Sequence, residues 1–215
     1  MSQWTLLLLG GTGAVGSEVL ALALVDARVA RVVAPARRAL PAQDKLSNPL
    51  VDFAHLPGAE WWNADACICT LGTTLHRAGS PEAFEQVDRH FVVEAARRAR
   101  AAGTPCFAYN SSLGANEKAR CLYLRVKGQT ERELEVLGFA SLTHVRPSLL
   151  DAGPRPDFRP GERLLLAITR PIRFLLPKSI RPVSTRAVAR ALLSAAQEAR
   201  PGRHCVESRE IIEAG

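Results

Sequence analysis

The sequence predicts an α/β fold, a doubly wound parallel sheet in a single domain over residues 1–215. Apolar segments of strand length alternate with helix-length segments, which is the pattern of a parallel sheet covered on both faces. A glycine-rich turn separates the first strand segment from the first helix segment. The composition, 47% hydrophobic and 23% charged, is that of a globular domain and excludes a disordered or fibrous chain. The expected architecture is therefore Rossmann-like.

In the first half of the chain, glycines and prolines mark where the elements begin and end. The run over residues 3–9 is apolar and stops at a glycine, which indicates a buried first strand. Pro81 suits the first turn of a long alanine-rich helix, and Gly103 ends that helix. Strands are expected over 3–9, 29–34, 50–53 and 64–70, and helices over 15–25 and 81–102.

In the second half, Pro105 stands just ahead of a strand, where a missing N–H is tolerated, and Gly138 stops a helix. Strands are expected over 106–110, 140–146 and 204–206, and helices over 119–137 and 185–200.

The composition changes after Leu150, since six of the 14 prolines fall between Pro154 and Pro182. An apolar stretch over 164–176 is broken by a proline and is expected to pack as a helix pair. We expect residues 151–215 to form a small C-terminal lobe on the substrate side of the sheet.

Charge and apolar patterning argue against nucleic-acid and membrane partners. The net charge is +7, but the arginines are spread along the chain without interleaved aromatic residues, so solvated arginines explain it better than a nucleic-acid surface. The longest clean apolar run near the start, Leu6 to Leu9, is far below the roughly 20 residues that a spanning helix needs. The sequence leaves a monomer and a homodimer open.

The five cysteines are an odd number with irregular spacing, which does not suit a disulfide framework. Cys67 and Cys69 would share one strand face and are expected to be buried, inert thiols. The start of the chain lacks the charged region of a secretory signal, and the five histidines show no metal-ligand spacing. These features predict a cytoplasmic protein without a metal site.

The glycine turn is the strongest functional signal. Gly10, Gly13 and Gly16 are spaced three and three, and Gly11, Gly13 and Gly16 give G-x-G-x-x-G. A tight turn and a close pyrophosphate both require residues without Cβ, and the last glycine lets the helix pack on the sheet. The free N–H groups at the helix start then hold the anion. Since the turn follows a strand and opens a helix, it predicts dinucleotide binding.

The end of the second strand predicts which dinucleotide binds. NAD sites usually carry an acid about 20 residues past the turn, which bonds the ribose 2′-hydroxyl. No acid lies between Asp26 and Asp44, whereas Arg37 and Arg38 stand just past the strand. A guanidinium matches the oxygens of a 2′-phosphate, so NADP(H) is favoured over NAD(H). The alternative is that both arginines are only solvated.

Tyr123 and Lys127 are four residues apart in an expected helix, which puts both side chains on one face. An ammonium close to a phenol stabilises the phenolate and lowers the pKa of the phenol, which can then protonate a carbonyl oxygen as hydride arrives. An ordinary exposed helix pair is the alternative. Ser111 and Ser112 follow the fifth strand at the carboxyl edge of the sheet, where a hydroxyl could orient a substrate carbonyl or form a loop turn.

Together these features resemble the short-chain dehydrogenase/reductase superfamily. Its atypical branch, which contains the Tat-interacting oxidoreductase, is similar in more detail. The segments that carry the resemblance are CTLGTT (69–74), VDRHF (87–91), SSLGAN (111–116), YLRVKGQTE (123–131) and RPSLL (146–150), and they span nearly the whole chain.

The resemblance implies a role for each matching residue. Tyr123 would be the catalytic acid, with Lys127 as its partner and as a ribose ligand, and Ser112, or else Ser111, would be the orienting hydroxyl. The cofactor would contact Gly10, Thr12, Gly13, Ala14, Val15, Gly16, Arg37, Arg38, Leu71, Gly72, Lys127, Leu150 and Arg159.

One position departs from the superfamily pattern. Many members place an Asn that supports a proton relay in the helix after the fourth strand, and the matching stretch here reads Val87-Asp88. Two functions therefore stay open. One is an NADP(H)-dependent oxidoreductase acting on a small carbonyl or alcohol substrate. The other is a non-catalytic NADP(H)-binding regulatory or redox-sensing protein.

Overall fold

The computed structural model describes residues 3–151 and 181–214, and within them seven strands form one parallel sheet in the order β3-β2-β1-β4-β5-β6-β9. The strands are β1 Trp4–Leu9, β2 Val29–Val33, β3 Leu46–Ser47, β4 Ala66–Cys69, β5 Cys106–Asn110, β6 Ser141–Arg146 and β9 Gly202–Glu207. A short parallel pair, β7 Leu150–Asp151 and β8 Val183–Ser184, stands apart from this sheet. The strand order runs outward from β1 in both directions, which confirms the predicted doubly wound fold.

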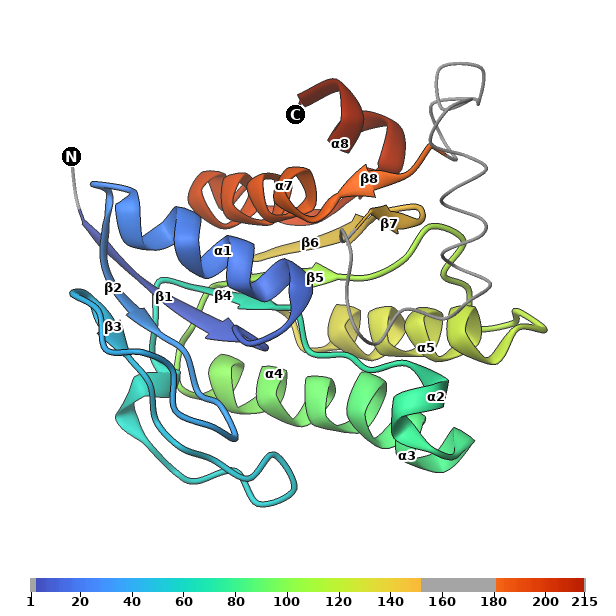
Figure 1. Ribbon diagram of the computed structural model, residues 1–215, viewed down its shortest axis with the longest axis horizontal. Helices are drawn as coiled ribbons and strands as arrows, with labels where there is room; N and C mark the ends of the chain where they lie inside the picture. Colours follow the sequence, from blue (N-terminus) through green and yellow to red (C-terminus); the bar gives the residue numbers. More distant parts are fainter. Residues whose placement is uncertain (1–2, 152–180, 215) are drawn as a thin grey trace.

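Helices cover both faces of the sheet (Figure 1). The helical segments are α1 Ala14–Val25, η1 Glu60–Trp62, α2 Leu75–Ala78, α3 Pro81–Glu85, η2 Gln86–His90, α4 Phe91–Ala101, α5 Leu122–Val136, α7 Thr185–Glu198 and α8 Ser208–Ala214. Helices α1 and α7 lie on one face, and α4 and α5 lie on the other.

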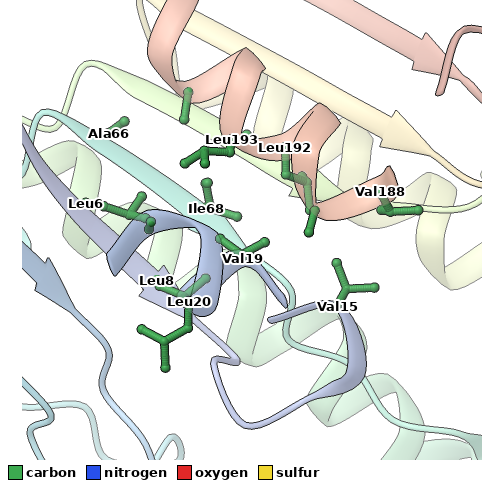
Figure 2. Close-up of a cluster of buried hydrophobic side chains, with 14 of the residues drawn as sticks. Leu6, Leu8, Val15, Val19, Leu20, Ala66, Ile68, Val188, Leu192 and Leu193 are labelled. Carbon is green, nitrogen blue, oxygen red and sulfur yellow. The ribbon is translucent and has the colours of Figure 1, made fainter. Parts of the chain in front are cut away.

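The leucine run of β1 serves two cores, because successive strand residues point to opposite faces. Leu6 and Leu8 join the cluster under α1 and α7, which also contains Val19, Ile68 and Leu192 (Figure 2). Leu7 and Leu9 join the cluster under α4 and α5. A strand buried on both faces has no polar position, which explains the continuous apolar run.

The cysteine prediction is confirmed. Cys67 and Cys69 are free, fully buried thiols that share the face of β4 covered by α4. Burial raises the pKa of Cys69 to about 12 and holds the pKa of Cys67 well above its usual range, so neither forms a thiolate at neutral pH.

The strand expected over 50–53 is wrong, because pairing with β2 occurs earlier, at Leu46–Ser47. The side chain of Asn48 bonds both the Leu40 N–H and the Ala34 carbonyl and ends the ladder there. Leu50 makes only an isolated bridge to Ala36, and its side chain is exposed. Val51 and Phe53 lie in a loop, and their side chains are buried in the hydrophobic core. The alternation of apolar and polar residues over 50–53 therefore reflects burial of a loop and not strand pairing.

The single helix expected over 81–102 is divided into α3, the π-helical turn η2 and α4. Ser80 caps its start by accepting the Ala83 N–H, and Pro81 occupies the first turn as predicted. The π-helical turn places Asp88 in the interior. Such turns inside α-helices frequently occur at functional sites.

The helix expected over 119–137 begins later, at Leu122, because the preceding loop folds back across it. A Cβ on Gly128 would lie 2.3 Å from the Asn116 carbonyl carbon, so the loop passes directly over this glycine. Two elements of the expected lobe belong to the main domain instead: β9 extends the main sheet beside β6, and α7 covers its α1 face. The rest of the expected lobe, including Arg159 and the stretch over 164–176, lies outside the described residues.

Replacing Leu192 tests whether α7 is part of the main core. Leu192 is fully buried against the α1 face, so Leu192→Ala should lower the free energy of unfolding by roughly 2–5 kcal/mol. Chemical denaturation measures this loss. Leu50→Ala, at a side chain that is 66% exposed, is the control and should change it by less than about 0.5 kcal/mol. A loss as small for Leu192 would mean that α7 is not packed as described.

Candidate functional site

The turn between β1 and α1 is built on contacts that only glycine permits. Gly10 has a φ of +86°, and a Cβ there would lie 2.7 Å from the carbonyl carbon of Thr70 on the β4 end. A Cβ on Gly16 would lie 2.1 Å from the Gly10 carbonyl oxygen. The helix therefore rests directly on the turn, and the turn rests directly on the chain after β4.

The start of α1 leaves its first N–H groups without a side-chain cap. Gly13 is the N-cap residue, and the first turn contains no acidic side chain. Thr12 and Gly13 are exposed, Ala14 is half-buried, and Val15 packs into the core below. Uncapped N–H groups at an exposed helix start, with the positive end of the helix dipole, favour an anion.

Arg37 and Arg38 follow the strand next to the one that leads into this helix. They follow β2, which pairs with β1, and both side chains are exposed. The backbone of Ala36 is fixed by bonds to Pro49 and Val51, so the segment that carries the two arginines has a defined path.

On the other side of β1, Leu71 and Gly72 follow β4. Leu71 is half-buried and Gly72 is exposed. A Cβ on Gly72 would lie 3.2 Å from the Asp88 carboxylate, and the N–H of Thr73 donates to that carboxylate at 2.7 Å. The loop after β4 is thus attached to a buried acid that the sequence motifs had not assigned to the site.

Tyr123 and Lys127 lie one turn apart on α5, as predicted, but in different environments. The Tyr123 side chain is 41% exposed and contacts the ring of Phe84, at 6.0 Å between ring centroids. Lys127 is 4% exposed. Its Nζ lies 3.0 Å from Asp88 Oδ1 and donates to the Tyr109 hydroxyl at 3.1 Å. The pair is an exposed phenol above a buried ammonium.

Burial disfavours the Lys127 ammonium, but the oxygens of Tyr109 and Asp88 outweigh this effect and hold the pKa of Lys127 well above its usual range. Burial also raises the pKa of the Tyr109 phenol well above its usual range. Because such a phenol keeps its proton at neutral pH, the Asp88 carboxylate is the group that balances the ammonium charge.

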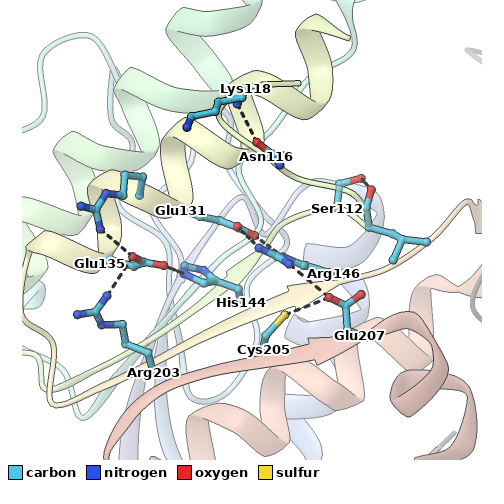
Figure 3. Close-up of polar contacts among 12 residues, drawn as sticks. Ser112, Asn116, Lys118, Glu131, Glu135, His144, Arg146, Arg203, Cys205 and Glu207 are labelled. Carbon is cyan, nitrogen blue, oxygen red and sulfur yellow. Dashed lines mark hydrogen bonds and ion pairs between the residues drawn. The ribbon is translucent and has the colours of Figure 1, made fainter. Parts of the chain in front are cut away.

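Ser111 and Ser112 follow β5 at the same edge of the sheet. Ser111 is buried, and its hydroxyl has no hydrogen-bond partner among the described residues. Ser112 is half-buried, and its hydroxyl donates at 3.4 Å to the Leu113 carbonyl (Figure 3). Leu150, in β7, is half-buried and packs against the core.

The parallel strands bring most of the predicted residues to one edge. The glycine turn, the arginines, the loop after β4 and the serines all follow the carboxyl ends of neighbouring strands. Ligands of doubly wound sheets bind at this edge, beside the central strand where the order reverses. The structure adds Asp88 and Tyr109 beneath Lys127, and only the departure from Asn at position 88 gave a sequence signal for either.

A second polar cluster joins α5 to β6 and β9 (Figure 3). Arg146 bonds both carboxylate oxygens of the buried Glu131, at 2.9 and 2.6 Å, and also reaches Glu207. His144 is buried beside them, 4.0 Å from Glu135, and neither ring nitrogen has a hydrogen-bond partner among the described residues. Burial lowers the pKa of His144.

The fold is that of a short-chain dehydrogenase/reductase. No family model matches the chain. The chain is 34% identical over 170 residues to Protein HTATIP2 of Rattus norvegicus, which covers 76% of this chain and 69% of that protein. It is 34% identical over 167 residues to the mitochondrial Protein fmp52 of Aspergillus niger, covering 74% of this chain and 71% of that protein. The chain belongs to the atypical short-chain dehydrogenase/reductase family of HTATIP2 and fmp52, which confirms the resemblance seen in the sequence.

Solved structures support the fold. MoeE5 in complex with UDP-glucuronic acid and NAD superposes with a TM-score of 0.73 at 17% identity, covering 97% of this chain and 80% of that one. The PhqB reductase domain from Penicillium fellutanum superposes with a TM-score of 0.67 at 19% identity, covering 96% of this chain and 67% of that one. At such identities the likeness concerns the fold alone.

The expected cytoplasmic location is contradicted, because the fmp52 relatives of three Aspergillus species are named mitochondrial. Free buried cysteines fit any reducing compartment, so the cysteine pattern could not separate the two locations. Within the described parts of the chain, every helix is too short or too polar to cross a bilayer.

The buried His144 predicts acid sensitivity. Its pKa is lowered in the folded state, so the unfolded chain takes up the proton first, and stability falls as the pH drops below the ordinary histidine value of about 6.5. Each unit of pKa difference removes about 1.4 kcal/mol. Urea denaturation at about pH 7.5 and about pH 5.5 should show a larger loss for the wild type than for His144→Gln. Equal losses would assign the acid sensitivity to other groups.

Proposed function

We propose that the protein is an NADP(H)-dependent oxidoreductase that transfers hydride between the dinucleotide and a small carbonyl or alcohol substrate. The observation that carries this proposal is the exposed Tyr123 phenol above the buried Lys127 ammonium, at the sheet edge that also holds the glycine turn. Two structural neighbours, MoeE5 in complex with UDP-glucuronic acid and NAD and the PhqB reductase domain, support this class of reaction.

The residues at the sheet edge fit a dinucleotide. The space that a Cβ at Gly10 or Gly16 would fill is already taken by backbone, so the turn can only be this tight with glycine. The uncapped start of α1 would take the pyrophosphate, and the exposed Arg37 and Arg38 would take a 2′-phosphate. The dinucleotide, when bound, supplies or accepts the hydride.

Proton transfer falls to the chain itself. In the reductive direction Tyr123 donates its proton to the substrate oxygen as hydride reaches the carbonyl carbon, which yields an alcohol and leaves a phenolate. Solvent returns the proton to this phenolate, because the Tyr123 side chain is exposed. The Lys127 ammonium stabilises the phenolate in between. Ser111, whose buried hydroxyl has no partner among the described residues, or Ser112 would orient the carbonyl.

One observation favours a second function, a non-catalytic NADP(H) sensor. Asp88, 3.0 Å from Lys127, stands where many members of the superfamily carry an Asn that supports a proton relay. A sensor would bind NADPH tightly, turn over no aldehyde, ketone or quinone, and bind a protein partner only with cofactor present.

Replacing Arg37 tests the choice of cofactor. Removing a charged hydrogen bond to the 2′-phosphate should weaken NADPH binding roughly 10- to 100-fold and leave NADH binding nearly unchanged, as calorimetry would show. Arg209→Ala, which removes the same charge from an exposed position on α8, is the control. If Arg37→Ala weakens NADPH and NADH binding equally, Arg37 does not contact the 2′-phosphate.

Replacing Tyr123 by Phe tests the chemistry. The variant keeps the ring contact with Phe84 but has no proton to donate, so turnover of aldehydes, ketones and quinones should fall at least about 100-fold. NADPH affinity, measured on the same preparation, should stay within about twofold. Activity that survives the loss of the hydroxyl would refute the acid role of Tyr123.

A further inference from the structure

Asp88 is a buried acid for which the motif residues provide no role. It lies on the π-helical turn η2 and is 1% exposed. An unpaired charge at such depth is strongly unfavourable, so its surroundings should show what it balances.

Three separate elements hold Asp88 in place. Its Oδ1 lies 3.0 Å from Lys127 Nζ on α5, and its Oδ2 accepts the Thr73 N–H of the loop after β4 at 2.7 Å. Its backbone carbonyl accepts the Thr130 hydroxyl at 3.1 Å and the Tyr109 hydroxyl at 3.5 Å. The carboxylate therefore stands at a fixed position between the cofactor loop and the catalytic helix.

The groups that face Lys127 leave one anion to balance it. Among the described residues, Asp88 approaches from η2, Tyr109 from β5, Cys69 from β4, and Tyr123 lies on α5 itself. Burial raises the pKa of both Tyr109 and Cys69, so these two groups are neutral at physiological pH. Asp88 is then the counter-ion of the ammonium.

We propose that Asp88 is a positioning residue, which fixes Lys127 as an ammonium ion and cancels enough of its charge that Tyr123 keeps its proton and acts as a donor. This inference rests on the proposed function of Tyr123 and Lys127. A lone ammonium favours the phenolate, whereas an ammonium paired with a carboxylate acts as a dipole whose field falls off faster with distance. The phenol form that results is the form that carbonyl reduction consumes.

The two tyrosines of the chain allow a direct test. Tyr109→Phe leaves Tyr123 as the one phenol, and its ionisation is followed by ultraviolet absorbance as the pH rises. Adding Asp88→Asn to this background removes the anion at constant size and should move the Tyr123 transition down by roughly one to two pH units. Adding Asp88→Glu instead restores a carboxylate and should return the transition toward that of Tyr109→Phe alone.

A purely structural ion pair would behave differently. Asp88→Asn would then lower the melting temperature but leave the Tyr123 transition unmoved, and that result overturns the proposal. If turnover is found, the pH at which the reductive rate falls should move down in Asp88→Asn by the same amount as the absorbance transition. A rate profile that stays in place while the absorbance transition moves would also overturn the donor role.

Asp88→Asn leaves the Lys127 ammonium buried without an anion, which opposes folding. If this variant does not fold, the proposal is tested on the wild-type protein. The chain has four lysines, and side-chain NMR with labelled lysine follows each one. Lys127 should keep its proton at a pH above the ordinary lysine pKa of about 10.4, because Asp88 holds it as an ammonium ion. A Lys127 that loses its proton below that pH would show that Asp88 does not hold it as an ammonium ion.

None of the titrations needs a dinucleotide or a substrate. Absence of NADPH binding or of turnover would therefore defeat the proposed function, while an unmoved Tyr123 transition would defeat the role of Asp88 alone.

Discussion

The site depends on a contact between backbones with no side chain between them. Gly16 of α1 rests on the carbonyl of Gly10, and Gly10 rests on the chain that leaves β4. Any Cβ at either position would push the helix away from the sheet edge, since the nearest atom it would meet belongs to the backbone and cannot move aside. The direction of α1, the position of its N–H groups and the path of the loop after β4 all follow from this contact.

The second constraint on the site is electrostatic. The chain buries an ammonium at Lys127, and a buried charge requires a partner, which Asp88 provides across the boundary between two helices. The same carboxylate holds the Thr73 N–H, so the loop expected to follow the cofactor and the helix expected to carry out proton transfer share one anchor. Disturbance of either should reach the other through Asp88.

Local signals were enough to predict most of the fold and the glycine turn, because strand burial, helix ends and tight turns depend on neighbouring residues. The short β3 could not be predicted, since it ends where Asn48 bonds Ala34 and Leu40, contacts that arise only in the folded chain. The role of Asp88 was missed for the same reason: its partners lie in the loop after β4, on β5 and on α5. The place of β9 beside β6 could not be predicted either, because the two strands pair only in the folded chain.

The π-helical turn has a consequence for how this region tolerates genetic change. An α-helix advances about 100° per residue, and a wide turn inserts one extra residue into that advance. Phe84 before the turn, Asp88 within it and Val92 after it are all buried. An in-frame loss of one codon between Gln86 and His90 would restore a regular helix, in which residues spaced three and seven apart still share a face. The apolar contacts of α3 and α4 would then persist, whereas the wide turn that places Asp88 beside Lys127 and Thr73 would be lost. Loss of a single codon here would therefore change the position of the acid before it changed the core.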